Sequence, residues 1–125
     1  MQTVLFVCQH GAGKSRMAAA WFNQAPAAGW WATTAGVEPQ QQVSVHAPRL
    51  LAGTPAEPTL DHQPPRPLSA VPGAALTVAI DCDVPGAVRW DLDAGQFSDA
   101  MCAEIRRRVH ALARAMSDPT AGEAR

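Results

Sequence analysis

The sequence predicts an α/β fold with three layers (α/β/α) around a central, mostly parallel sheet of four strands. Short apolar runs alternate along the chain with segments of helical periodicity, which is the element order of a parallel sheet covered by helices. The first of these runs leads directly into a glycine-rich turn and a helix start. Strands are expected at residues 3–8, 30–35, 76–80 and 88–92.

The first strands and the first helix have clear signals. Residues 3–8 are apolar and β-branched without interruption, which is typical of a strand buried on both faces. A helix is expected from residue 12 or 14 to about residue 24, because Met17 and Trp21 lie four apart on one face. The strand at 30–35 is closed by a glycine.

The middle of the chain is less regular. A weak helix is expected at residues 43–51, and Pro48 would cut it unless this proline lies in the first turn. Residues 54–72 contain six prolines and show no periodicity. This composition predicts an irregular loop with at most a short strand or turn.

The last helix has the strongest pattern. Its apolar residues recur at alternating three- and four-residue spacings and form one stripe: Cys102, Ile105, Val109, Leu112 and Met116. Ser98 or Asp99 is a suitable N-cap. The arginine run at 106–108 occupies the other faces, and in a chain of net charge −1 it is interpreted as a solvated helix face.

Composition indicates a single globular domain. The 125 residues suffice for one core, expected in residues 1–118 with a C-terminal tail at 119–125. The net charge predicts neither a nucleic-acid partner nor an anionic membrane surface, and no apolar run approaches the roughly 20 residues of a membrane helix. With no basic leader and an odd number of cysteines, the expected compartment is the cytoplasm. The oligomeric state stays open.

The segment from Cys8 to Ser15, here named the Cys8 loop, carries the chemistry. It runs from a strand end to a helix start through these residues: Gln9, His10, Gly11, Ala12, Gly13 and Lys14. Successive backbone N–H groups in such a turn, with the helix dipole, bind an oxyanion such as phosphate. The same field favours the thiolate form of Cys8, to which the only lysine of the chain adds a positive charge. The loop therefore predicts a nucleophilic thiolate beside a bound anion.

The Cys8 loop resembles that of the low-molecular-weight protein tyrosine phosphatases and the related thioredoxin-coupled arsenate reductases. Their loop reads Cys, five residues, Arg, Ser, and commonly one further residue before Met-Ala. Here Lys14-Ser15-Arg16-Met17-Ala18 stands at these positions. The similarity continues through Thr34-Ala35-Gly36 to Pro39, residues 65–68, the strand at 76–80 and Trp90-Asp91-Leu92-Asp93-Ala94-Gly95, so it covers nearly the whole chain in order.

The resemblance implies a role for individual residues. Cys8 would act as nucleophile on phosphate, arsenate or a phosphorylated substrate, by phosphomonoester hydrolysis or arsenate reduction. The amides of residues 9–13 and Lys14 would bind the anion, and Ser15 would stabilise the thiolate. An aspartate before the last helix would be the general acid, with Asp93 preferred and Asp91 in reserve. No metal or cofactor is implied, apart from thioredoxin or another thiol reductant in a reductase.

Lys14 departs from the family pattern, which has arginine there. Lysine keeps the charge but lacks the planar fork that holds two oxygens at once. Losing one charge-assisted hydrogen bond in the transition state would slow the reaction roughly 10- to 100-fold. Arg16 is not expected to compensate, because the helix turns it about 200° away from Lys14. Gly11 replaces the usual asparagine and adopts a left-handed conformation without help.

The remaining cysteines and histidines give weaker signals. Cys82 is the candidate redox partner of Cys8, so a disulfide between them stays open. Cys102 lies on the apolar stripe and is expected to be structural, which disfavours a relay of three cysteines. His10 is interpreted equally as an anion contact or as space filling, and the histidines show no metal-ligand spacing.

Two other functions remain open. The Cys8 loop is almost a nucleotide-binding P-loop, but Cys8 stands where that motif has its first glycine. A homologue that binds an oxyanion or a partner without turnover is the other alternative, because of Lys14. The chain contains no tyrosine, so an aromatic rim for an aryl substrate would come from one of four residues: Trp30, Trp31, Trp90 and Phe97.

Overall fold

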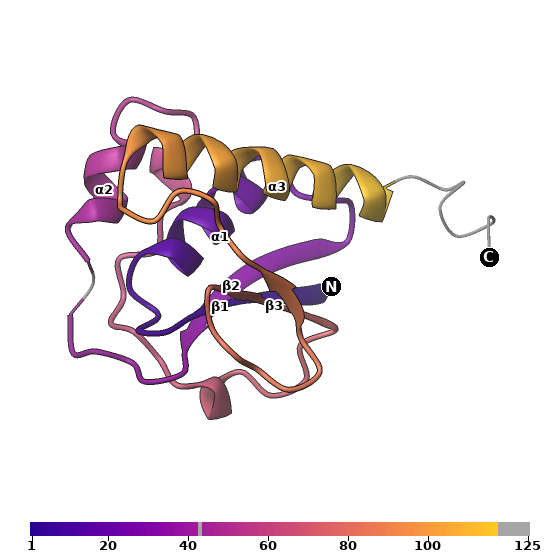
Figure 1. The fold of residues 1–125 in the computed structure, drawn as a ribbon. Coiled ribbons are helices and arrows are strands. Elements are labelled where there is room, and N and C mark those ends of the chain that lie inside the picture. The colour runs from indigo at the N-terminus through magenta and orange to yellow at the C-terminus, as the bar shows by residue number, and fades with distance from the viewer. Residues whose placement is uncertain (43, 118–125) are drawn as a thin grey trace.

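Four parallel strands form one sheet in the order β2-β1-β3-β4 (Figure 1). The structure is a computed structural model that describes residues 1–42 and 44–117. The central strands are β1 (Gln2–Cys8) and β3 (Leu76–Ile80), and the edge strands are β2 (Trp30–Gly36) and β4 (Val88–Trp90). The predicted parallel sheet of four strands is confirmed.

Side chains of β1 alternate between two apolar clusters, because successive residues of a strand point to opposite faces. Val4 and Phe6 join the larger cluster, which also contains residues of all three α-helices. Leu5 and Val7 face the smaller cluster on the other side of the sheet. This double burial explains why the sequence of β1 is apolar without interruption.

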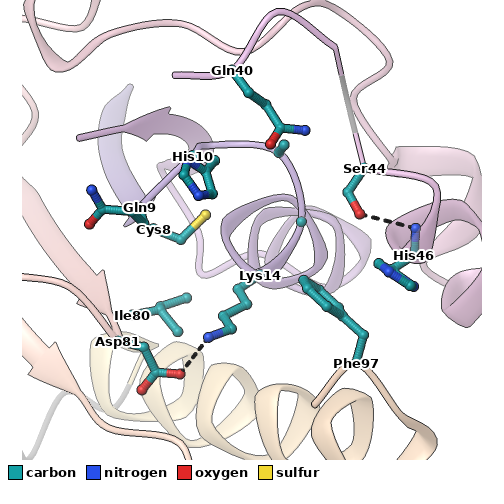
Figure 2. A pocket seen from close by; sticks show the side chains of 12 residues that line it. Cys8, Gln9, His10, Lys14, Gln40, Ser44, His46, Ile80, Asp81 and Phe97 are labelled. Carbon is teal, nitrogen blue, oxygen red and sulfur yellow. Dashed lines mark hydrogen bonds and ion pairs between the residues drawn. The ribbon is translucent and has the colours of Figure 1, made fainter. Parts of the chain in front are cut away.

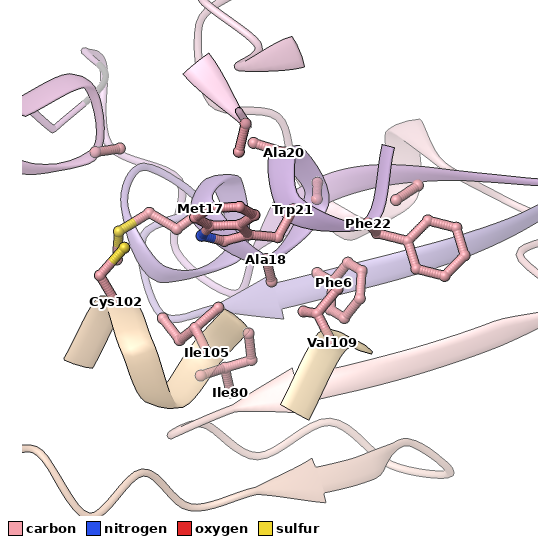
Figure 3. Close-up of a cluster of buried hydrophobic side chains, with 14 of the residues drawn as sticks. Phe6, Met17, Ala18, Ala20, Trp21, Phe22, Ile80, Cys102, Ile105 and Val109 are labelled. Atoms are coloured by element: carbon pink, nitrogen blue, oxygen red, sulfur yellow. The ribbon is translucent and has the colours of Figure 1, made fainter. Parts of the chain in front are cut away.

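The helices α1 (Lys14–Gln24), α2 (His46–Leu51) and α3 (Asp99–Ser117) lie on the side of the larger cluster. Figure 3 shows Trp21 of α1, Ile105 of α3 and Phe6 of β1 within this cluster. The layer on the opposite face is thin. It consists of the single-turn 3-10 helix Leu68–Ala70 and neighbouring loop residues.

The irregular segments largely follow the sequence. Pro48 is the third residue of α2 and so lies in its first turn, while Val43, where this helix was expected to begin, lies outside the described residues. Residues 54–72 contain two short 3-10 helices, at Glu57–Thr59 and Leu68–Ala70. Strand β4 ends earlier than expected, because the Leu92 N–H donates to the Asp81 carboxylate.

The last helix is capped by Ser98, whose hydroxyl accepts a hydrogen bond from the Met101 N–H at 3.2 Å. The arginine run is more than a solvated face, because Arg106 lies over the Trp21 ring at 4.6 Å and Arg108 donates to Glu104. The expected domain end at residue 118 and the tail lie outside the described residues. No helix within residues 1–42 and 44–117 is long and apolar enough to cross a membrane.

Candidate active site

The Cys8 loop forms the floor of a pocket of about 430 Å³ at the carboxyl ends of β1 and β3. After β1 the chain adds β2 along one edge of β1, and it later adds β3 along the opposite edge. Ligands of open α/β sheets bind where the strand order reverses in this way. The lining residues come from the loop and from four other segments: Cys8, Gln9, His10, Ala12, Gly13, Lys14, Gln40, Ser44, His46, Ile80, Asp81 and Phe97 (Figure 2).

The backbone of the Cys8 loop is oriented by hydrogen bonds to its carbonyl groups. Those of residues 8, 9, 10 and 12 accept from the N–H groups of residues 37, 38, 40 and 44, and the Gly11 carbonyl accepts from Arg16. In a trans peptide the next N–H points opposite to the carbonyl, and no peptide bond described here is cis. The N–H groups of residues 9–13 therefore face away from those partners, and none has a protein acceptor within residues 1–42 and 44–117. Four of these residues, Gln9, His10, Ala12 and Gly13, line the pocket, and free backbone donors there can bind an oxyanion.

Cys8 and Ser15 are in direct contact. The Cys8 side chain is 5% exposed, and its Sγ lies 3.2 Å from the Ser15 Oγ. Ser15 is fully buried and belongs to the first turn of α1, whose N-terminus carries partial positive charge. When the sulfur is a thiolate, the hydroxyl can donate to it, which is the stabilising contact expected of Ser15.

Lys14 contacts the carboxylate of Asp81, which the sequence places in a site only for the nucleotide-binding alternative, as the acid after an apolar strand. Its Nζ lies 2.8 Å from the Asp81 Oδ2, and its side chain is directed at Asp81 (Figure 2). Asp81 directly follows β3, in the left-handed region with φ 52°. The sequence signal for Asp81 is its place directly after the apolar strand β3. That it lies next to Lys14 follows only from the strand order, in which β3 pairs with β1.

Arg16 is buried beneath the Cys8 loop rather than turned away to solvent. Its side chain is 1% exposed, its Nε donates to the Gly11 carbonyl at 3.0 Å, and one terminal nitrogen donates to the Asp61 carbonyl at 2.7 Å. Burial lowers the pKa of Arg16, and the Asp61 carboxylate partly opposes this. Arg16 therefore holds the loop from behind, as expected of a residue that does not reach the anion.

Asp61 joins Arg16 to Arg66, and both Asp61 and Arg66 belong to residues 54–72, here named the Pro-rich segment. Arg66 donates to the Asp61 carboxylate at 2.8 Å and to the Thr34 carbonyl at 3.1 Å. Burial alone would raise the pKa of Asp61, but hydrogen bonds from Arg66 and from the Gln63 N–H, with the charges of both arginines, lower it. This network ties the loop to β2.

Comparison with known proteins supplies the family. No family model and no curated protein matches the sequence. Among solved structures, an arsenate reductase from Archaeoglobus fulgidus is 34% identical with a TM-score of 0.71, over 88% of this chain and 98% of that one. An arsenate reductase in the phosphate binding state has a TM-score of 0.74 at 18% identity, over 94% of this chain and 100% of that one. A low-molecular-weight protein tyrosine phosphatase from T. tengcongensis has a TM-score of 0.66 at 20% identity, over 90% and 97%.

The chain belongs to the arsenate reductase and low-molecular-weight phosphatase superfamily. The resemblance identified from the Cys8 loop and the segments after it is thereby confirmed.

Neither candidate general acid lines the pocket. The Asp93 side chain is exposed, while its backbone N–H donates to Glu104 at 3.0 Å. Asp91 is exposed as well and accepts from Arg89 at 2.7 Å. The general-acid role of Asp93 stays a prediction, and it requires the loop at residues 91–96 to approach the pocket when substrate binds.

All three cysteines are buried free thiols. Cys82 is adjacent to the site but outside the pocket lining, and its Sγ donates to the Val7 carbonyl at 3.6 Å. Burial, with the nearby Cys8, raises the pKa of Cys82, which disfavours its thiolate. Cys102 lies in the large apolar cluster, as expected of a structural residue.

Aromatic contact with the pocket comes from Phe97 among the four candidates. Its ring stacks on His46 with centroids 4.6 Å apart and an angle of 9°. A Cβ on Gly13 would lie 2.6 Å from the Phe97 ring, so only glycine allows this close approach. His10 also lines the pocket, with Nδ1 3.3 Å from the Glu38 carbonyl. In the described residues, no group of three His, Cys, Asp or Glu side chains could hold a metal ion.

Proposed function

We propose that this protein acts on tetrahedral oxyanions, either arsenate or a phosphate monoester, with the Cys8 thiolate as nucleophile. The observation that carries the proposal is the Cys8 sulfur at 3.2 Å from Ser15, in a pocket lined by four residues whose backbone N–H groups are free, namely Gln9, His10, Ala12 and Gly13. In these roles Ser15 stabilises the thiolate, residues 9–13 bind the anion, and Lys14 adds positive charge. The likeness to arsenate reductases supports the same chemistry.

The Cys8 sulfur would react with either substrate in two steps, through a covalent adduct. With a phosphate monoester, Cys8 Sγ bonds to phosphorus, the P–O bond to the leaving group breaks, and water then hydrolyses the thiophosphate. With arsenate, Sγ bonds to arsenic as one oxygen leaves as water. A second thiol then attacks Sγ, the S–As electron pair stays on arsenic, and arsenite leaves a disulfide behind. Cys82, thioredoxin or a small thiol can supply that second sulfur.

Turnover and binding assays test the proposal together. Purified protein is assayed for hydrolysis of an artificial aryl phosphate, and for arsenite release from arsenate with a dithiol in excess. Phosphate, arsenate and Mg-ATP are compared by thermal shift, since a ligand of the folded state raises its stability. Cys8→Ser should abolish both activities. Stabilisation by Mg-ATP alone would instead support the nucleotide-binding alternative.

The second thiol is identified by a matched pair of variants. If Cys82 resolves the adduct, Cys82→Ser should abolish arsenite release with thioredoxin as reductant, while Cys102→Ser should leave it unchanged. If both variants keep full activity, the second sulfur comes from the external thiol.

The proposed compartment is the cytoplasm, because free thiols and a dithiol reductant are compatible with its reducing conditions.

A non-catalytic oxyanion-binding protein is the second candidate, because Lys14 is paired with Asp81. Lys14→Arg separates it from a working enzyme. A planar guanidinium can hold two oxygens of the transferring group, so a working phosphatase should gain turnover, and the gain should vanish in Cys8→Ser. Anion binding without turnover in every variant would support the non-catalytic protein.

A further inference from the structure

An ion pair occupies part of the pocket in which the Cys8 thiol lies. Lys14 Nζ and Asp81 Oδ2 are 2.8 Å apart, with side chains 24% and 26% exposed, and both residues line the pocket. We propose that Asp81 is an internal counter-ion that competes with the substrate oxyanion for Lys14, and that this competition makes the pocket discriminate against doubly charged anions. The inference rests on the proposed anion-binding role of the Cys8 loop.

Asp81 is the fixed member of the pair. Its N–H donates to the Trp90 carbonyl at 2.9 Å, and its Oδ1 accepts from the Leu92 N–H at 2.8 Å. Its backbone adopts φ 52°, a conformation in which Asp and Asn are enriched among non-glycine residues. Lys14 carries its charge on a flexible four-carbon stem. An arriving anion must therefore draw Lys14 toward itself or accept a fixed carboxylate beside it.

The charge balance favours anions of low charge. The other titratable side chains that line the pocket are the Cys8 thiol and the two imidazoles His10 and His46. Asp81 cancels the charge of Lys14, so the attraction for an anion comes mainly from the backbone N–H groups and the helix dipole. Repulsion by the carboxylate grows in proportion to the charge of the anion. A dianion is thus penalised more than a monoanion.

Asp81→Asn tests the competition with little change in backbone. Asparagine tolerates the left-handed conformation, and its amide oxygen can keep the bond from the Leu92 N–H. Asp81→Gly is a second variant that fits a positive φ and adds no new donor. Asp83→Asn is the matched control. Asp83 lies two residues from Asp81 and carries the same charge, but its side chain is 96% exposed.

Calorimetric titrations with sulfate, a fixed dianion, and with perchlorate, a tetrahedral monoanion, give the decisive numbers at one pH. Asp81→Asn and Asp81→Gly should each bind sulfate about tenfold more tightly than the wild type, and perchlorate only slightly more tightly. Asp83→Asn should match the wild type. With Lys14→Met in the background, the gain from Asp81→Asn should be smaller, because no ammonium is freed and only the relief of carboxylate repulsion remains.

The outcomes separate the two proposals. Weaker or unchanged sulfate binding in both Asp81 variants would overturn the competition, as would a full gain that persists without Lys14. Either result leaves the proposed function intact if Cys8-dependent turnover is observed. Absence of anion binding in the wild type and in every variant would overturn the anion-binding role itself, and the competition with it.

Discussion

A Cβ atom on Gly36 would lie 2.6 Å from the backbone nitrogen of Gly11. The end of β2 and the Cys8 loop therefore meet backbone to backbone, and the Gly11 φ of 65° belongs to the same contact. The Thr34-Ala35-Gly36 segment noted in the sequence thus shapes the anion-binding loop without lining the pocket.

Gly36→Ala should displace the loop. We expect the free energy of unfolding to fall by about 1–3 kcal/mol, because neither backbone can yield easily, and phosphate affinity to fall with it. Urea denaturation and calorimetric titration measure the two effects. Gly95→Ala is the control, since a Cβ there meets no neighbour within 4 Å. Equal behaviour of the two variants would contradict the contact.

Ser15→Ala should impair the thiolate without moving the loop. The lost hydrogen bond to Cys8 is expected to slow turnover roughly 10- to 100-fold, and to slow alkylation of Cys8 by iodoacetamide. Phosphate affinity should change little, because the backbone donors stay in place. Mass spectrometry of the alkylated peptides gives the Cys8 rate separately from those of Cys82 and Cys102. An unchanged rate would remove Ser15 from the mechanism.

Arg16→Met should destabilise the protein by about 3 kcal/mol or more. Loss of the buried guanidinium leaves the Gly11 and Asp61 carbonyls without their donor. The Gly11 peptide, no longer held, can then rotate out of the anion site. Arg107→Met, on the exposed face of α3, is the comparison and should stay within about 0.5 kcal/mol of the wild type. If Arg16→Met keeps full phosphate affinity, the loop does not depend on this arginine.

Glu104 gives the fold a dependence on acid pH. Burial alone would raise its pKa, but hydrogen bonds from the Asp93 and Ala94 N–H groups and from Arg108 outweigh burial and lower it. A carboxylate with a lowered folded-state pKa stabilises the protein above its unfolded pKa, and this stabilisation is lost as pH falls through the folded value.

Glu104→Gln should therefore lower the free energy of unfolding at neutral pH, and the difference from the wild type should shrink as pH falls below about 4. Urea denaturation across pH measures it. Glu57→Gln, at an exposed carboxylate, is the matched control for the loss of one acidic side chain. A constant difference across pH for Glu104→Gln would mean that ionisation of this residue is not the cause.

Local signals in the sequence predicted the strands, α1 and the Cys8 loop well, because each depends on neighbours in the chain. The apolar run of β1, the glycines after it and the stripe of α3 each describe a single element. Asp81 could not be predicted as the partner of Lys14 in this way, since their contact depends on β3 lying beside β1.

Two other residues show the same limit. The helical wheel correctly turns Arg16 away from Lys14, but burial beneath the loop depends on the Asp61 carbonyl, 45 residues further along the chain. The family resemblance makes Asp93 the candidate general acid, yet the bonds from its N–H to Glu104 belong to a contact that no local pattern reveals. Side chains that act across elements need the tertiary structure.

The Pro-rich segment lies between α2 and β3 in the sequence, and its Asp61 and Arg66 form an ion pair at 2.8 Å. A break in the chain at residues 63–65 would divide the pocket between two fragments, with Cys8 and Lys14 on the first and Asp81 and Phe97 on the second. The Asp61–Arg66 ion pair, together with the pairing of β1 with β3, would hold these two fragments together. Reassembly of the split protein would then be visible as the return of its Cys8 chemistry, which makes this segment a natural point for a two-fragment reporter.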